Sequence, residues 1–159
     1  MEADWPDDAP RPVYYIHRVG AGEVLYLNLG HCRGHYDMQP MIEYFARLEL
    51  LKLLAQTPTI RTRVSADYHD IETITAADIL ITYTCNLVPT EPEQQALADW
   101  VAGGGTWFAL HGTNSILRFL ADGRVDAPET APVFMQTLGT QFIAHPPIQP
   151  FRVTVSDPE

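Results

Sequence analysis

The chain has 159 residues, of which 46% are hydrophobic and 10% aromatic, a composition that suits one globular domain with its own core. Twenty acidic against ten basic residues give a formal net charge of -10, which argues against nucleic acid or an anionic membrane as the main partner. The start "MEADWPDDAPRP" is acidic and proline-rich where a signal peptide is basic and then apolar, and no long apolar run follows, so we expect a cytoplasmic protein.

In chain order, residues 1–12 predict a mobile acidic arm, and residues 13–159 predict one α/β domain. "EVLYLNLG" (23–30) indicates a strand that ends in a polar loop, and Pro40 then opens a helical pattern of apolar residues. That pattern comprises Met41, Ile42, Phe45, Leu48, Leu51 and Leu54.

The middle of the chain predicts two strands and the clearest helix. "TIRTRVS" (59–65) alternates as an edge strand does, while "DILITYT" (78–84) is nearly continuous in apolar and β-branched residues, as in an interior parallel strand. In "TEPEQQALADWVAGGG", Thr90 and Glu93 have the spacing of a capping box, and Gly103 is placed to end the helix.

"GTWFALHGTNSILRF" (105–119) predicts a strand over "TWFAL", a sharp turn at His111 and a helix from about Ser115 through Leu120. "FRVTVSD" (151–157) alternates and indicates an outer strand. Strands alternating with helices predict a parallel sheet covered on both faces, whose ligand site lies beyond the carboxyl ends of the strands.

Three segments leave those ends, "GHCRGHYD", "TCNLVP" and "HGTNS". We therefore expect one polar cleft that gathers side chains scattered along the sequence. These are His31, Arg33, His35, Asp37, Cys85, Asn86, His111, Thr113 and Asn114.

His111 is the strongest catalytic candidate, because an imidazole suits acid or base chemistry near neutral pH and the backbone N–H groups of Gly112 and Thr113 would point to the same spot. The structural alternative is a histidine hydrogen-bonded to a neighbouring loop. His145 is the second candidate, since two following prolines fix its backbone, and its alternative is a histidine on a rigid surface turn.

The first loop has two interpretations. His31, His35 and Asp37, joined by His111 or His145, could bind a divalent first-row transition metal, or the loop could bind a polar substrate without metal. Arg33 pairs either with a substrate carboxylate or with surface acids. Cys85 at the end of a strand is typical of packing.

The segments "GGGTWFALHGTNS" and "LGTQFIAHPPIQPFRVTVSDPE" resemble the ThuA-like family, the trehalose-utilisation proteins with the class I glutamine amidotransferase fold. The resemblance covers about residues 24–159 and is most specific in "LH", "FIAHPPIQPF" and "VSDP". It implies a flavodoxin-like sheet in which His111 stands where amidotransferases have their cysteine, and it implies that His145 turns into the same cleft. Family members usually continue past "DPE", so the resemblance also implies the front part of a longer domain.

Two hypotheses of function follow. The first is an enzyme of disaccharide or keto-sugar metabolism, with His111 and His145 as catalytic residues and no glutaminase activity. The loop from His31 to Asp37, with Asn86, Gly112, Thr113 and Asn114, would bind the sugar without a required cofactor. The second is a non-catalytic ligand-binding or assembly module. We also expect a homo-oligomer, a dimer, because the outer strand "FRVTVSD" offers an open edge.

Overall fold

The computed structural model describes residues 2–3, 11–12, 14–27, 50–110, 112–122, 124–144 and 153–154. The chain divides into two compact units, one of residues Gly30–Ala66 and one that joins Met1–Leu29 to Asp67–Glu159. In the smaller unit, residues 50–55 are helical, which confirms the last part of the helix predicted from Pro40, whereas residues 40–49 lie outside the described residues. Within the described ranges, no helix has the length and apolar character needed to cross a bilayer.

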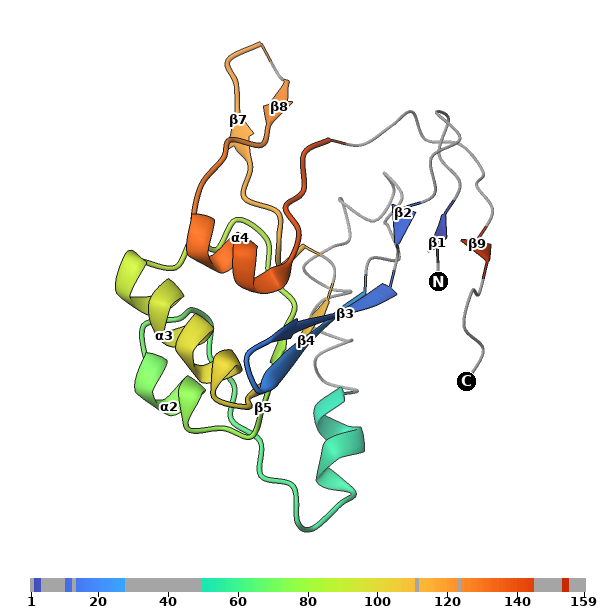
Figure 1. Ribbon diagram of the computed structural model, residues 1–159, viewed down its shortest axis with the longest axis vertical. Helices are drawn as coiled ribbons and strands as arrows, with labels where there is room; N and C mark the ends of the chain where they lie inside the picture. Colours follow the sequence, from blue (N-terminus) through green and yellow to red (C-terminus); the bar gives the residue numbers. More distant parts are fainter. Residues whose placement is uncertain are drawn as a thin grey trace. The chain divides into compact units, whose positions relative to one another are not determined.

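The larger unit combines short strands with three described helices (Figure 1). In chain order the elements are β1 Glu2–Ala3, β2 Arg11–Pro12, β3 Tyr14–Val19, β4 Gly22–Leu27, α2 Ile71–Thr75, β5 Ile79–Thr82, α3 Glu91–Ala102, β6 Thr106–Leu110, β7 Arg118–Phe119, β8 Val125–Asp126, α4 Pro132–Leu138 and β9 Val153–Thr154. The strands predicted over 23–30 and "TWFAL" are confirmed as β4 and β6.

The main sheet has four strands in the order β3-β4-β6-β5. β4, β6 and β5 are parallel, so the prediction of an α/β fold is confirmed. The sheet is nevertheless mixed, because β3 runs antiparallel to β4. Val19 pairs with Gly22, which leaves Gly20 and Ala21 as a two-residue hairpin loop, and Gly20 has the positive φ of 60° that such a loop requires.

The core lies between this sheet and helices α3 and α4. Trp107 of β6 is fully buried, and its ring meets that of Phe134 of α4 edge to face, with centroids 5.4 Å apart. The same cluster contains buried residues of both helices and of β4, so α3 and α4 cover one face of the sheet. These residues include Val24, Leu97, Val101, Ala109 and Leu138. Helices on the opposite face stay a prediction.

Helix α3 forms as its sequence predicts. The predicted capping box of Thr90 and Glu93 is present, with the backbone N–H of Thr90 donating to Glu93 Oε2 at 2.6 Å, and Gly103 is the C-cap. Leu97 and Val101 are fully buried, whereas Trp100 is half-buried and its indole N–H donates to the carbonyl of Ala77. Burial of this stripe fixes the helix against the sheet.

Strand β5 corrects one prediction. It pairs only with β6 among the described strands, so within the described part of the sheet it lies at an edge and not in the interior. Ile79 is 60% exposed and Tyr83 36% exposed. Part of the apolar surface of this run is exposed to solvent. A continuous apolar run therefore does not by itself predict a neighbouring strand on both sides.

The strand predicted over residues 59–65 is also wrong. Residues 58–59 form a turn and residues 60–65 have no regular secondary structure. Every residue from 56 to 66 is exposed. The alternation of "TIRTRVS" has no buried face to pair with, and without one a period of two does not specify a strand.

The helix predicted from Ser115 to Leu120 does not form. Residues 112–114 form a turn, residues 115–117 are irregular, and β7 begins at Arg118. Gly112 has a φ of 92°, and the following Thr113, Asn114 and Ser115 use their polar groups in local and tertiary hydrogen bonds. Side chains of this kind compete with the backbone bonds of a helix.

Two small sheets complete the larger unit. β7 and β8 form an antiparallel hairpin, and β2, β1 and β9 form a three-stranded sheet in that order. β9 lies within "FRVTVSD" and, among the described strands, is at the edge of this small sheet, as an outer strand was predicted to be. Glu2–Ala3 and Arg11–Pro12 pair as strands, whereas the mobility of residues 1–12 stays a prediction.

Candidate functional site

The segments that follow β5 and β6 lie together at the carboxyl ends of these strands. The backbone N–H of Asn86 donates to the carbonyl of Ser115 at 2.9 Å. In return, the N–H of Leu117 donates to the side-chain oxygen of Asn86. Asn86 adopts a φ of 59°, a left-handed conformation that asparagine tolerates better than most residues. The predicted approach of these two loops is confirmed for the described residues.

The residues after position 111 are buried rather than open to solvent. Thr113 is 1% exposed, and its hydroxyl donates to Thr82 Oγ1 at 3.0 Å. Trp107 Nε1 donates to the same Thr82 oxygen at 2.9 Å. Asn114 is also buried, and its carbonyl accepts from the N–H of Phe142. These groups tie the turn to the sheet and to the segment after α4.

Two buried hydroxyl groups lie close to this edge. Among the described residues, Tyr68 OH and Thr84 Oγ1 have no hydrogen-bond partner of good geometry. Burial raises the pKa of Tyr68 to about 12, and the nearby Thr84 hydroxyl opposes that rise. Tyr68 packs its ring against Phe134, edge to face at 5.7 Å, so it is a core residue with a polar end directed to the carboxyl edge.

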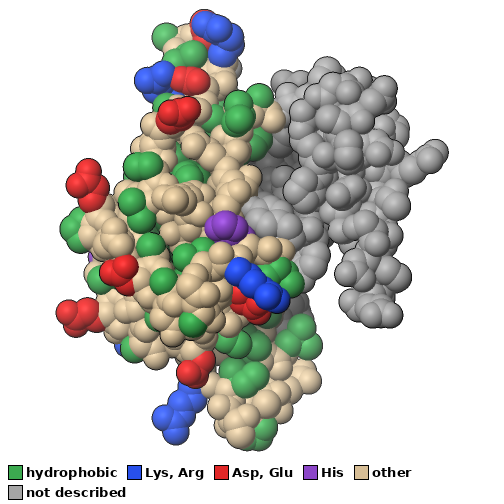
Figure 2. Space-filling view, in the orientation of Figure 1, with side chains coloured by type: hydrophobic (Ala, Val, Ile, Leu, Met, Phe, Trp, Pro, Cys, Tyr) green, Lys and Arg blue, Asp and Glu red, His purple; other side chains and the backbone are tan. Residues whose placement is uncertain are grey.

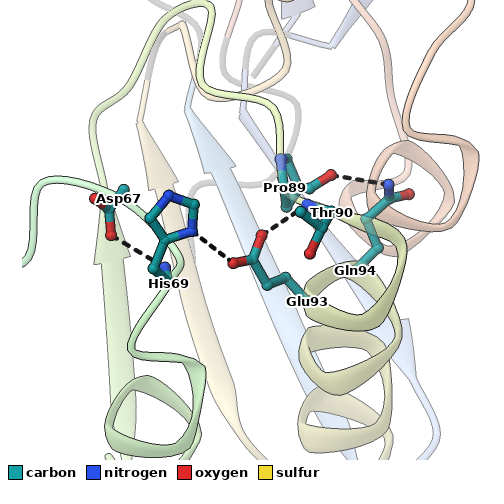
Figure 3. A network of polar contacts seen from close by, with 6 residues as sticks. All are labelled: Asp67, His69, Pro89, Thr90, Glu93 and Gln94. Atoms are coloured by element: carbon teal, nitrogen blue, oxygen red, sulfur yellow. Dashed lines mark hydrogen bonds and ion pairs between the residues drawn. The ribbon is translucent and has the colours of Figure 1, made fainter.

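A histidine and a glutamate pair at the start of α3 (Figure 3). His69 Nδ1 and Glu93 Oε1 are 2.9 Å apart, and the other carboxylate oxygen accepts from Thr90. The Glu93 side chain is only 10% exposed, whereas that of His69 is 76% exposed. The backbone N–H of His69 donates to Asp67, which fixes the loop before α2. One imidazole nitrogen is thus held by a buried carboxylate, an arrangement that orients a histidine for proton transfer.

Each member of this pair shifts the pKa of the other. The hydrogen bond to Glu93 raises the pKa of His69 above its ordinary value of 6.5, and the charge of Asp67 adds to that rise. Burial acts to raise the pKa of Glu93, but the hydrogen bonds from His69 and Thr90 outweigh it and lower the pKa below 4.5. The pair is therefore most strongly ionised between these two ordinary values.

Sequence reasoning missed His69. The capping-box spacing singled out Glu93, but its histidine partner lies 24 residues away and depends on how α2 packs against α3. The only sequence signal was the polar run "ADYHD" before a helix.

The pairing predicts a pH-dependent loss of stability on changing His69 to alanine. Because the folded pKa of His69 is raised, its contribution is fully present below the unfolded pKa and is lost as the pH rises through the folded pKa. Urea unfolding of wild type and His69→Ala should therefore differ more at about pH 6 than at about pH 9.

Glu93→Gln provides the matched background for this measurement, because it removes the charge and keeps the side-chain shape. In that background the extra loss at the lower pH should become much smaller, because only the charge of Asp67 then raises the pKa of His69. An equal effect of His69→Ala at both pH values would show that the ion pair contributes no measurable stability.

Six predicted site residues lie outside the described residues: His31, Arg33, His35, Asp37, His111 and His145. The predicted metal ligands are all among them. Within the part of the chain that the structure does describe, no three histidine, cysteine, aspartate or glutamate side chains are grouped to hold a metal ion. The metal site stays a prediction.

Surface hollows of the described residues lie elsewhere. One of about 350 Å³ and one of about 420 Å³ are at the amino ends of the strands, and both include Gly104 in their lining. Several glycines line these hollows, whereas the buried hydroxyl groups and the His69–Glu93 pair lie at the carboxyl ends. The carboxyl edge is therefore the better candidate site.

Comparisons with protein-family models, with curated proteins and with solved structures give no match. Any function must therefore be argued from the residues of this chain and the geometry described above.

Proposed function

We propose that this chain is a cytoplasmic ThuA-like protein with a flavodoxin-like, amidotransferase-like fold, which acts on a disaccharide or keto-sugar at the carboxyl ends of β4, β5 and β6. The observation that carries the proposal is the contact between the segments of Asn86 and Ser115. Loops that follow adjacent parallel strands form the usual ligand site of an open α/β sheet.

The choice of a sugar rests on the sequence motifs "LH", "FIAHPPIQPF" and "VSDP". In this proposal His111 and His145 exchange protons with sugar hydroxyl or carbonyl groups, and Asn86 forms hydrogen bonds to the substrate. Glutaminase chemistry is not part of the proposal, because His111 stands at the position of the nucleophilic cysteine in the family resemblance.

A second candidate is a ligand-binding or assembly module without catalysis. One specific observation favours it. Over the described residues 112–122 no helix follows the turn at Gly112, so this segment has no helix N-terminus to supply N–H groups to a developing charge. Thr113 and Asn114 moreover stabilise the fold, which reduces the set of groups free to contact a substrate.

Titration calorimetry and product analysis with trehalose and a 3-keto-glucoside distinguish the two candidates. For an enzyme, His111→Ala should lower kcat/KM about 100-fold or more, the usual range for loss of an acid or base. His17→Ala is the matched control, since the His17 ring lies against Gly139 at the end of α4. Binding without turnover would support the module, and the absence of both would overturn the sugar proposal.

A further inference from the structure

The β7–β8 hairpin has two different faces. Phe119 and Val125 lie opposite each other across the two strands and are 70% and 52% exposed. Arg118 and Asp126 also lie opposite each other, and their side chains form an ion pair. Because successive residues of a strand point to opposite faces, the apolar pair and the charged pair are on different sides of the hairpin.

This hairpin has little stability of its own. Each strand has two residues, and within the described residues β7 and β8 pair only with each other. A two-stranded hairpin is marginal in water, and its outer edges present backbone groups that can pair with another strand. Figure 1 shows the hairpin projecting beyond α3 and α4. An exposed aromatic residue on a projecting hairpin leaves apolar surface in water unless a partner covers it.

The charges of the hairpin favour a second copy of this chain as the partner that buries these apolar side chains. Arg118 and Arg124 balance Asp122 and Asp126, so these four side chains sum to zero, whereas the chain carries -10. Figure 2 shows both signs of charge at this projecting end. Two copies with this net negative charge repel each other over most of their surface. Contact through the neutral hairpin keeps the acidic remainder of the two chains apart, so this repulsion is smaller.

We infer that the β7–β8 hairpin is an association surface for a second copy of this chain. Phe119 and Val125 of one hairpin pack on those of the other about a two-fold axis. A two-fold axis makes this contact self-complementary, because each copy presents the same apolar pair to the other. The inference does not depend on the sugar proposal, because none of the hairpin residues belongs to the candidate site.

Sedimentation velocity on the whole chain, over about 5 to 200 μM, tests the inference through the concentration dependence expected of a reversible dimer. Wild type should change from monomer to dimer over this range. Phe119→Asp should raise the dimer dissociation constant at least tenfold, roughly the effect of removing a central aromatic contact. Val125→Ser provides a second variant if the first unfolds.

Val88→Asp is the matched control, because Val88 is 51% exposed but lies in the segment before α3. It should leave the dimer unchanged. A wild-type chain that stays monomeric at the highest concentration would overturn the inference. A dimer that both hairpin variants leave intact would overturn it as well, since another surface must then hold the copies together.

Discussion

Replacing Phe134 by alanine is expected to lower the free energy of unfolding by about 3–5 kcal/mol, the usual range for deleting a buried aromatic ring. Phe134 is fully buried and packs edge to face against both Trp107 and Tyr68. Its removal leaves a cavity where α4 meets the sheet, and two rings lose their partner. Urea unfolding followed by tryptophan fluorescence measures the loss directly, since Trp107 reports on this core.

Ile143→Ala is the control for this variant, because Ile143 is 79% exposed. It should change the stability by no more than about 0.5 kcal/mol. If Phe134→Ala were equally mild, α4 would not pack on the sheet as described, and the edge-to-face contacts would have no energetic weight.

The parts of the fold that the sequence predicted are those decided by local rules. Helix α3 carries its own cap at Thr90 and Glu93 and its own apolar stripe, so its ends did not depend on distant residues. β4 and β6 are short apolar runs between polar or glycine-rich segments, which is sufficient to indicate buried strands.

The wrong predictions share a different cause. Whether "DILITYT" is central or at an edge depends on which strands lie beside it, and no local pattern reports that. The segment after Gly112 has enough apolar residues for a helix turn, but the Thr113 hydroxyl donates to Thr82 and the backbone N–H of Leu117 donates to the side chain of Asn86 instead. Tertiary partners decided both outcomes.

The sequence predicted where the candidate site lies on the sheet, but not which side chains are buried or paired there. Topology alone brought the segment of Asn86 to that of Ser115, because parallel neighbours end at one edge. The burial of Thr113 and the pairing of His69 with Glu93 arise from contacts between residues 31 and 24 positions apart. Such contacts are fixed by packing, which sequence spacing does not encode.

Gly112→Ala is expected to destabilise the chain by about 2–4 kcal/mol. The alanine would be strained at a positive φ, and its Cβ would also clash with a neighbouring backbone atom. Gly112 has a φ of 92°, and a Cβ there would lie 2.4 Å from the backbone oxygen of Thr84, which cannot move without shifting β5.

Gly104→Ala isolates the strain from the collision, since Gly104 has a φ of 114° but open space where its Cβ would be. Thermal unfolding of both variants should therefore show a lower Tm for Gly112→Ala, and the difference measures how tightly the turn after β6 packs on the end of β5. Equal Tm values would mean that the turn can withdraw from Thr84 at no cost. The segments after β5 and β6 would then be held together by hydrogen bonds such as those of Asn86 and Thr113, and not by close backbone packing.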